Sequence, residues 1–206
     1  MELKEAIVGR RSVRKFKSDP ISRELILEIL RQANMAPSAG NQQPWEFIVL
    51  ESKRIMEMLK ITKIAFTERF DSMEEEELEA MLSRLSIPDE DSYAGLRRFY
   101  STMGGAPVVI IAITKRGKDE FSWLKNCAST AAAVQNLLLA AWDKGLGTCW
   151  MMGPLQKKEE QLKDLFEVPE DKMIVAIIPV GVPEKRPASP VKESVENKVR
   201  WDIVSK

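Results

Sequence analysis

The pattern that most constrains the fold is a long, nearly uncharged helix in the second half of the chain. Residues 122–144 (SWLKNCASTAAAVQNLLLAAWDK) have a middle that is apolar or small on almost every side. Such a helix is stable only when it is buried, because none of its faces suits water. Its uncharged run, 127–142, contains Ser, Thr, Gln and Asn and is shorter than the ~20 apolar residues of a membrane span. We therefore expect this helix in the core or in a subunit interface.

Short apolar runs that are typical of strands lie on both sides of this helix. Residues 108–114 (VVIIAIT) and 173–181 (MIVAIIPVG) are nearly continuous apolar runs, which predicts strands covered on both faces. Further strands are predicted at 45–51 and 148–152. Helical periodicity predicts the remaining elements, which are helices at 2–9, at 23–34 with Ser22 as N-cap, from Ser52 onward, and at 157–166. The alternation indicates an α+β or α/β domain around about four or five strands.

Length and composition limit the class of protein. A chain of 206 residues that is 44% hydrophobic and 30% charged is expected to form one domain, 1–206. Lysine plus arginine number 31, as do aspartate plus glutamate, so the composition argues against nucleic-acid and membrane-surface partners. The two cysteines form no CxxC pair, and the first residues lack the apolar core of a signal peptide. These features predict a cytoplasmic protein.

The sequence contains no histidine. Its absence excludes Ser-His-Asp and Cys-His nucleophile systems, the HExxH zinc site and histidine proton shuttles. No metal site is expected. If the chain is an enzyme, a group other than the usual catalytic side chains must perform its chemistry.

Two segments differ in amino-acid composition from the rest of the chain. Residues 61–92 include EEEE at 74–77 and no clear strand, which indicates either a mobile helical excursion over the domain or a solvated helix face. The segment 183–206 combines prolines with many charges and offers little material for a core. It is expected to be an extended tail that lies on another surface.

The basic segment RRSVRKF, residues 10–16, follows the first predicted helix. If it is extended, Arg10, Ser12 and Arg14 share one face, while Arg11, Val13 and Lys15 share the other. Two guanidiniums beside a hydroxyl suit a phosphate ester, because arginine offers forked donors to phosphate oxygens. The alternative is a solvated basic segment.

Three other segments carry weaker signals. The uncharged loop PSAGNQQPW (37–45) suits the edge of a polar heterocycle, or is an ordinary loop. In GLGTCWMMG (145–153), Trp150 breaks the GxGxxG pattern and the helix precedes the strand, which excludes a Rossmann dinucleotide site. Its glycines instead permit close approach of a packed neighbour or a flat ligand. Lys198 and Arg200 share a face if the tail is extended, or are surface charges.

Taken in order, these motifs resemble the nitroreductase family of FMN-dependent oxidoreductases. The similarity rests on RRSVRKF, APSAGNQQPWEFIVLE, AAAVQNLLLAAWDKGLGTCWMMG and VGVPEKRP, and it covers nearly the whole chain except 61–100. The resemblance implies an α+β nitroreductase-like fold with a mostly antiparallel central sheet, surrounded by helices. It also implies a homodimer with FMN at the subunit interface, a variable helical lid at 61–100, and a C-terminal extension, 183–206, that wraps the partner subunit.

The resemblance also implies FMN-binding residues. Those that would hold the phosphate, the ribityl chain and one ring edge are Arg10, Arg11, Ser12 and Arg14. Those that would line the ring from the other subunit are Pro37, Ser38, Ala39 and Asn41. Those that would pass beside the central ring are Trp150, Met151, Met152 and Gly153, and a tail pair, Lys198 and Arg200, would close on the phosphate. Arg97 and Arg98 are the nearest candidates for a helical FMN contact, and Cys149 is expected to be a small packed residue.

By the same resemblance, NADH or NADPH would reduce FMN at N5, and a small electron acceptor would then take its place in a ping-pong cycle. Nitroaromatics and quinones are the expected acceptors, and Arg11 and Lys15 would steady negative charge on the reduced ring. The alternatives are reductive dehalogenation or flavin fragmentation on the same fold, or a non-enzymatic flavin-binding protein.

Overall fold

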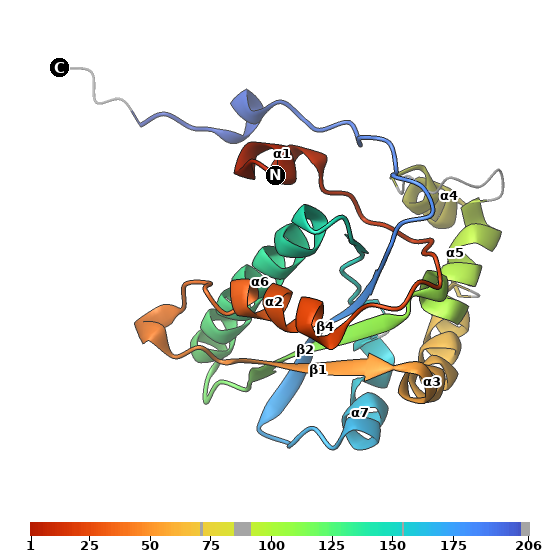
Figure 1. Ribbon diagram of the computed structural model, residues 1–206, viewed down its shortest axis with the longest axis horizontal. Helices are drawn as coiled ribbons and strands as arrows, with labels where there is room; N and C mark the ends of the chain where they lie inside the picture. The colour runs from red at the N-terminus through yellow and green to blue at the C-terminus, as the bar shows by residue number, and fades with distance from the viewer. Residues whose placement is uncertain (71, 85–91, 154, 203–206) are drawn as a thin grey trace.

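The computed structural model describes residues 1–70, 72–84, 92–153 and 155–202 (Figure 1). Its helices are α1 (Leu3–Gly9), α2 (Arg23–Ala33), α3 (Ser52–Phe70), α4 (Glu75–Arg84), α5 (Ser92–Thr102), α6 (Glu120–Asp143) and α7 (Leu155–Phe166). Its strands are β1 (Trp45–Glu51), β2 (Val108–Lys115), β3 (Gly147–Thr148) and β4 (Lys172–Gly181). Short 3-10 turns occur at η1 (Ala39–Asn41), η2 (Met103–Gly105) and η3 (Val195–Lys198). In the described part, no helix is both long and apolar enough to span a bilayer.

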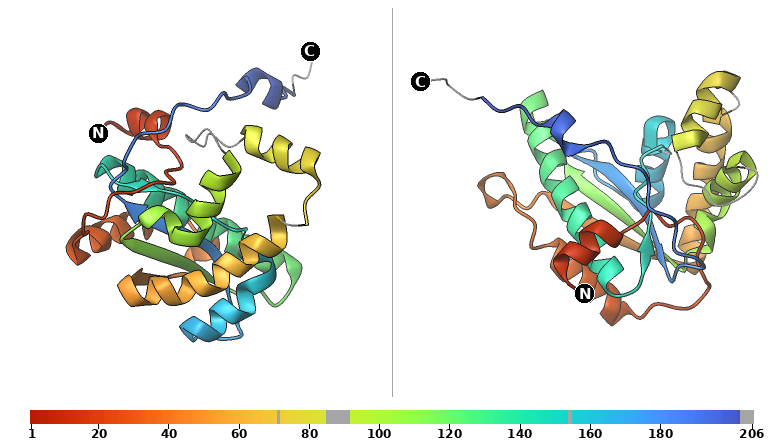
Figure 2. Two further views of the ribbon diagram at one scale, coloured as in Figure 1. Left: turned by 90° about the vertical axis from the view of Figure 1, so that its right-hand side faces the viewer. Right: turned by 90° about the horizontal axis from the view of Figure 1, so that it is seen from above.

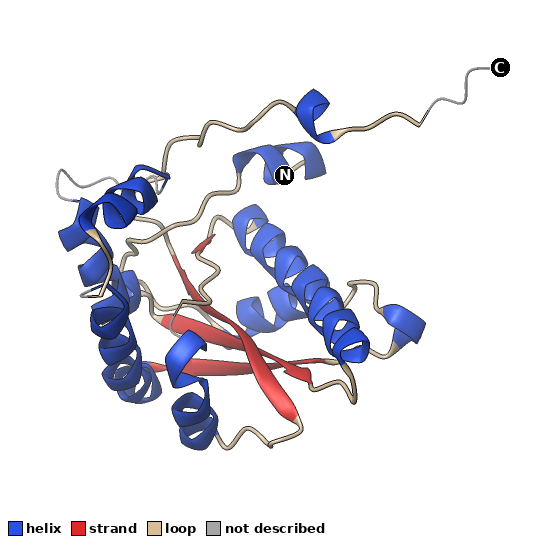
Figure 3. Ribbon diagram, turned by 180° about the vertical axis from the view of Figure 1, so that it is seen from behind, coloured by secondary structure: helices blue, strands red, loops and turns tan. Residues whose placement is uncertain are grey.

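The strands form one sheet in the order β1-β2-β4-β3, and each neighbouring pair is antiparallel (Figure 3). This confirms the α+β class with a small antiparallel sheet. The central strand β2 is buried along its length except at its last residue. Strand β4 is likewise buried from Ile174 to Gly181, so both strands are covered on two faces, as their continuous apolar runs predict.

Alternation along β2 divides the core into two clusters. Val109, Ile111 and Ile113 face a cluster that includes Met58 and Phe66 of α3. Their neighbours Val108, Ile110 and Ala112 face the opposite cluster, made largely by α2 and α6. Because side chains of a strand alternate between faces, one apolar strand can serve both layers. Figure 2 shows these layers, with α6 on one side of the sheet and α3 and α5 on the other.

Helix α6 is the longest element and packs its middle against the sheet. It begins at Glu120 because the Asp119 side chain accepts a hydrogen bond from the Ser122 backbone N–H at 2.7 Å, an N-cap that the sequence prediction of 122–144 did not include. Its buried residues include Val134 and Leu137. The first turns are exposed, with Phe121 75% accessible to solvent. The prediction of a buried helix is thus confirmed for its middle and its C-terminal half.

One local prediction is wrong. The strand expected at 148–152 is limited to Gly147–Thr148, because only these residues form a continuous ladder with β4, and Met151 makes just one isolated bridge to Ile177 of the same strand. The helix expected from Ser52 onward is confirmed, since α3 begins at Ser52, whose φ is 41°.

The described part of 61–100 is helical, as expected, and much of it belongs to the core. Phe66 and Phe70 of α3 are buried, as are Leu96 and Phe99 of α5. All four lie in the same apolar cluster as Val109 and Ile111 of β2. Residue 71 and residues 85–91, which also fall in the expected lid, lie outside the described residues.

The C-terminal tail extends away from the body of the molecule. It runs past α1 and continues outward (Figures 1 and 2). Val191 is 99% exposed and Trp201 is 80% exposed. The tail is therefore extended as predicted, and its apolar side chains are left without a surface to cover in the single chain.

Candidate functional site

The site begins with the basic segment, which lies extended between three other parts of the chain. The Val13 N–H donates to the Thr148 carbonyl at 2.8 Å, and the Phe16 N–H donates to the Gly104 carbonyl at 2.9 Å. The Lys17 N–H donates to the Val182 carbonyl at 2.8 Å. The segment is thus fixed at strand β3, at turn η2 and at the end of β4, which gives its side chains defined directions.

Glycines make this close packing possible. A Cβ on Gly104 would lie 2.3 Å from the Arg14 carbonyl oxygen, and Gly104 also has φ of 65°. A Cβ on Gly147 would lie 2.6 Å from Val13 Cγ2. Because both distances are far below van der Waals contact, the basic segment can occupy its position only when these residues lack side chains.

The predicted alternation of the segment is confirmed only in part. Val13 is 1% exposed and belongs to the core. Arg11, which was expected to share a face with Val13, instead lines one cavity together with Arg10, Ser12 and Arg14. Burial raises the pKa of Cys149, and the charges of Arg14 and Arg10 and a hydrogen bond with Ser12 oppose that rise. Arg10, Ser12 and Arg14 therefore all lie near this buried thiol.

Two cavities border this residue group. One of about 550 Å³ is lined by Arg10, Arg11, Ser12 and Arg14, and by the tail residues Pro187–Pro190. A second, of about 500 Å³, is lined by Ser12, Arg14 and Lys15, and also by Arg98 of α5. Both volumes fall in the range of small-ligand sites, ~300–1,000 Å³.

The guanidiniums of Arg10 and Arg14 have neither an ion pair nor a hydrogen bond among the residues that the structure describes. Both side chains are half-buried. Burial, reinforced by the nearby charge of Arg11, lowers the pKa of Arg10 from its ordinary value. Arg11, in contrast, donates to the Val8 carbonyl at 2.7 Å, to the Arg10 carbonyl at 2.8 Å and to the Ser189 hydroxyl. The two unpaired cations beside Ser12 are suited to bind an anion.

The segment 150–153 lies next to this group through Cys149. Met151 exchanges two backbone hydrogen bonds with Ile177, at 3.0 and 2.9 Å. The Trp150 indole N–H is buried without a hydrogen-bond partner in the described structure, and Met152 is 57% exposed. The backbone is therefore fixed by β4, while an unsatisfied donor and an exposed side chain remain for a ligand.

The other predicted site residues lie elsewhere in the single chain. The loop that contains Pro37, Ser38, Ala39 and Asn41 packs against α6 and is far from the basic segment (Figures 1 and 2). Its shape is set by the Gln43 N–H, which donates to the Ser38 hydroxyl at 3.0 Å. In the exposed tail, Lys198 pairs with Glu193, and Arg200 is solvent-exposed. Of the predicted FMN-binding residues, a single chain thus brings together those of the basic segment, 10–14, and those of the segment 150–153.

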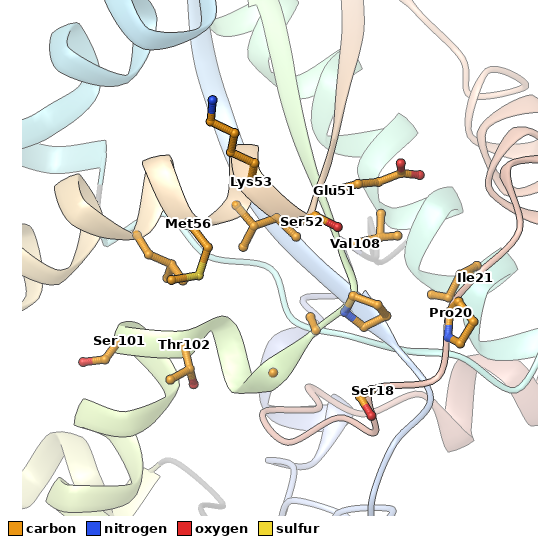
Figure 4. A pocket seen from close by; sticks show the side chains of 15 residues that line it. Ser18, Pro20, Ile21, Glu51, Ser52, Lys53, Met56, Ser101, Thr102 and Val108 are labelled. Carbon is orange, nitrogen blue, oxygen red and sulfur yellow. The ribbon is translucent and has the colours of Figure 1, made fainter.

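A larger cavity, of about 830 Å³, contains none of the predicted residues (Figure 4). It lies where β1 meets α3, with Ser52, Lys53 and Met56 on one side, and Ser101 and Thr102 of α5 on the other. It shares Thr102 and Gly105 with the cavity that Ser12, Arg14 and Lys15 line, but no residue of the basic segment lines it.

Sequence reasoning missed two polar side chains that approach Gly153. A Cβ on Gly153 would lie 3.0 Å from Tyr100 Oη and 3.3 Å from Arg69 Nη1. Both residues come from 61–100, whose helical pattern does not indicate which residues face the site. No recognisable motif marks Tyr100 as a site residue, because it simply follows Arg97, Arg98 and Phe99 in the sequence.

Comparison with known proteins identifies the family. The nitroreductase family model matches residues 7–182, and the chain belongs to this family. A Bacillus subtilis relative, named "Putative NAD(P)H nitroreductase YfhC", is 30% identical over 90% of this chain and 86% of its own. An iodotyrosine deiodinase of Thermotoga neapolitana is 27% identical over 90% of this chain and 91% of its own.

Solved structures agree on the fold. The chain superposes with a TM-score of 0.80 on NfnB, an FMN- and NADPH-dependent nitroreductase from Sphigopyxis sp. strain HMH. That match covers 99% of this chain and 100% of the other at 19% identity. The nitroreductase-like fold expected from the sequence is therefore confirmed, and family membership makes the chain an oxidoreductase.

Proposed function

We propose that the protein is an FMN-dependent NAD(P)H oxidoreductase that reduces a small electrophile such as a nitroaromatic or a quinone. The observation that carries the proposal is the pair of half-buried guanidiniums of Arg10 and Arg14, which have no ion pair with any described residue and line, with Ser12 between them in the sequence, a cavity of about 550 Å³. Family membership and relatives named as nitroreductases support it.

The residues present fit FMN. A phosphate would supply the anion that Arg10 and Arg14 lack, and Ser12 could bind a phosphate or ribityl oxygen. The orphaned Trp150 indole N–H and the chain through Met152 and Gly153 would lie along the ring. When bound, FMN would supply the two-electron redox chemistry. Arg11 lines the same cavity, but its guanidinium is already held by Val8, Arg10 and Ser189.

A homodimer would complete the site. Pro37–Asn41 and the pair Lys198 and Arg200 would reach the ring and the phosphate of the partner's FMN. Apolar surface for such an interface exists on α1, where Leu3, Ile7 and Val8 are each more than half exposed. The exposed Trp201 of the tail would find a surface on the second chain.

The identities of the electron donor and the acceptor are part of the proposal, because the names of this chain's relatives point to different reactions. They include a 4-nitrobenzoate reductase, the iodotyrosine deiodinase and a 5,6-dimethylbenzimidazole synthase. The direct assay is reduction of protein-bound FMN by NADH or NADPH, seen as loss of the yellow colour, followed by reoxidation with a nitroaromatic or a quinone. A protein that is colourless, takes up no FMN and remains monomeric would refute the proposal.

A sharper test separates the phosphate from the rest of the cofactor. Arg10→Gln should weaken FMN binding by about ten- to one-hundred-fold, since a hydrogen bond to a charged group contributes about 1.5–3 kcal/mol. Riboflavin, which lacks the phosphate, should lose far less. Arg23→Gln is the matched control, because Arg23 is a highly exposed arginine whose ion pair in the described part of the chain is with Glu51. Equal losses for FMN and riboflavin would contradict a phosphate role for Arg10.

A further inference from the structure

The first residues of the C-terminal tail run antiparallel to the basic segment of the same chain (Figure 1). The Lys17 N–H donates to the Val182 carbonyl at 2.8 Å. Further along the tail, the Glu184 N–H donates to the Lys15 carbonyl at 3.1 Å, and the side chains of these two residues form an ion pair at 3.0 Å. This part of the tail is therefore fixed before the chain reaches the cavity of about 550 Å³ in which we propose that FMN binds.

Arg11 closes the C-terminal end of helix α1. Its guanidinium donates through Nη1 to the Val8 carbonyl at 2.7 Å and to the Arg10 carbonyl at 2.8 Å. The last carbonyls of a helix have no partner within the helix, and an arginine side chain can satisfy them. These two bonds fix the guanidinium at the end of α1 and leave Nη2 for a third partner.

The third partner is the tail. Arg11 Nη2 donates to the Ser189 hydroxyl, which is the last hydrogen bond from the described part of the tail to the rest of the chain. Beyond Ser189, the polar contacts of the described tail residues, such as the ion pair of Lys198 with Glu193, lie within the tail itself. Val191 is already 99% exposed. Ser189 is therefore the point at which the tail leaves the body of the molecule.

This hydrogen bond holds one wall of the cavity. Residues 187–190 line the same cavity as Arg10 and Arg14. The last three of these tail residues are exposed, so packing contributes little to keeping them in place. The preceding anchor is Arg186, whose guanidinium lies 5.1 Å from the centroid of the Trp142 ring. Without the hydrogen bond, the wall would be held from one end only.

The arginines of the basic segment differ in what they can offer a ligand. The guanidiniums of Arg10 and Arg14 have neither an ion pair nor a hydrogen bond with any described residue. Arg11, in contrast, already has three acceptors, and its Nε–H is buried. Such a cation can still shape a site, because a wall that is held before binding spares the ligand the cost of ordering it.

We infer that Arg11 and Ser189 form a latch that fixes residues 187–190 as a wall of the FMN cavity, and that this latch slows release of the cofactor. The inference rests on the proposed function, because it concerns retention of FMN in the same cavity. Arg11 is a positioning residue for the wall, whereas Arg10 and Arg14 bind the phosphate. Opening of the wall acts mainly on dissociation, since affinity differences between closely related complexes arise largely in the off-rate.

Ser189→Ala tests the latch, because it removes only the acceptor hydroxyl. The rate of FMN release, followed as recovery of flavin fluorescence on dilution, should rise by about three- to ten-fold. The thermal midpoint of the cofactor-free protein should not change, because Ser189 is exposed. Ser189→Thr retains the hydroxyl and should release FMN at the wild-type rate. Ser194→Ala is the matched control, because the hydroxyl of this exposed tail serine bonds to Glu196 within the tail.

A double-mutant cycle shows whether the two side chains act together. Arg11→Met and Ser189→Ala should each speed FMN release, and the double variant should be no faster than Arg11→Met, because both changes break the same bond. Effects that multiply in the double variant would overturn the inference.

Proteolysis tests the latch without the cofactor. Trypsin should cut the cofactor-free protein after Lys192 faster in Arg11→Met than in the wild type, because Ser189 lies just before this site and is no longer held. The sequence around the cut is the same in both proteins. Equal rates of cleavage would contradict the latch.

The possible failures are distinct. Unchanged FMN release in Ser189→Ala would overturn the latch and leave the proposed function intact. Faster release together with a lower thermal midpoint of the cofactor-free protein would do the same, because it would show a general structural role. A wild-type protein that takes up no FMN would overturn both.

Discussion

Gly104 offers a direct test of how the basic segment is held. Gly104→Ala would place a Cβ 2.3 Å from the Arg14 carbonyl oxygen, where ordinary contact begins at 3.4 Å. The two backbones would therefore have to separate by about 1.1 Å, the difference between these distances. That movement would stretch the hydrogen bond from the Phe16 N–H to the Gly104 carbonyl, now 2.9 Å, and would shift Arg14.

The magnitude follows from two costs. An alanine at φ of 65° loses about 1–2 kcal/mol relative to glycine, because its Cβ crowds the following carbonyl. Overpacking of the close contact adds about 1–3 kcal/mol. We therefore expect the free energy of unfolding to fall by about 2–5 kcal/mol. Displacement of Arg14 should also weaken FMN binding.

Gly145→Ala separates the two costs. Gly145 has φ of 77°, and a Cβ there would meet nothing within 4 Å, so only the conformational cost applies. Urea denaturation followed by circular dichroism gives the stability, and quenching of flavin fluorescence gives the affinity for FMN. Equal destabilisation by Gly104→Ala and Gly145→Ala, with FMN affinity unchanged in both, would refute the account of the close contact.

Other predictions concern the tail, the buried thiol and the interface. Removal of residues 193–206 should leave the circular dichroism spectrum and the thermal midpoint nearly unchanged at low concentration, because Trp201 is 80% exposed, yet should weaken the dimer in analytical ultracentrifugation. Since burial raises the pKa of Cys149, stability should be complete below the ordinary thiol pKa of about 8.5 and should decline as the pH rises through that value. Urea unfolding at increasing pH measures this, and Cys149→Ala should flatten the profile. Val8→Asp should reduce dimer formation, because this exposed side chain lies on the expected interface; a variant that dimerises normally would exclude α1 from it.

The sequence predicted those elements whose physical signals are local. Continuous apolar runs located β2 and β4, and Ser22 marked the start of α2, where its hydroxyl accepts from the Leu25 N–H at 3.2 Å. The alternation of Arg10 and Ser12 with buried Val13 followed from strand geometry alone. Each of these features depends on residues that are close in the sequence, so the sequence alone predicts it.

Features that depend on distant contacts were missed. Cys149 and Trp150 leave the sheet because the ladder with β4 ends at Thr148 and resumes only as a single bridge at Met151, which is a property of two strands together. Tyr100 reaches Gly153 across 53 positions of sequence, through the packing of α5 on α3. The roles of Pro37–Asn41 and of the tail involve a second chain, and they stay predictions.

Segments from the two ends of the chain lie side by side at the candidate site. Lys17 donates to Val182, Glu184 donates to Lys15 at 3.1 Å, and Phe16 bridges to Pro183. During translation the basic segment is synthesised early, whereas its partners at 182–184 are synthesised only when most of the chain is complete. Cofactor loading is therefore expected to be a post-translational event, and a nascent chain stalled before β4 should not retain flavin.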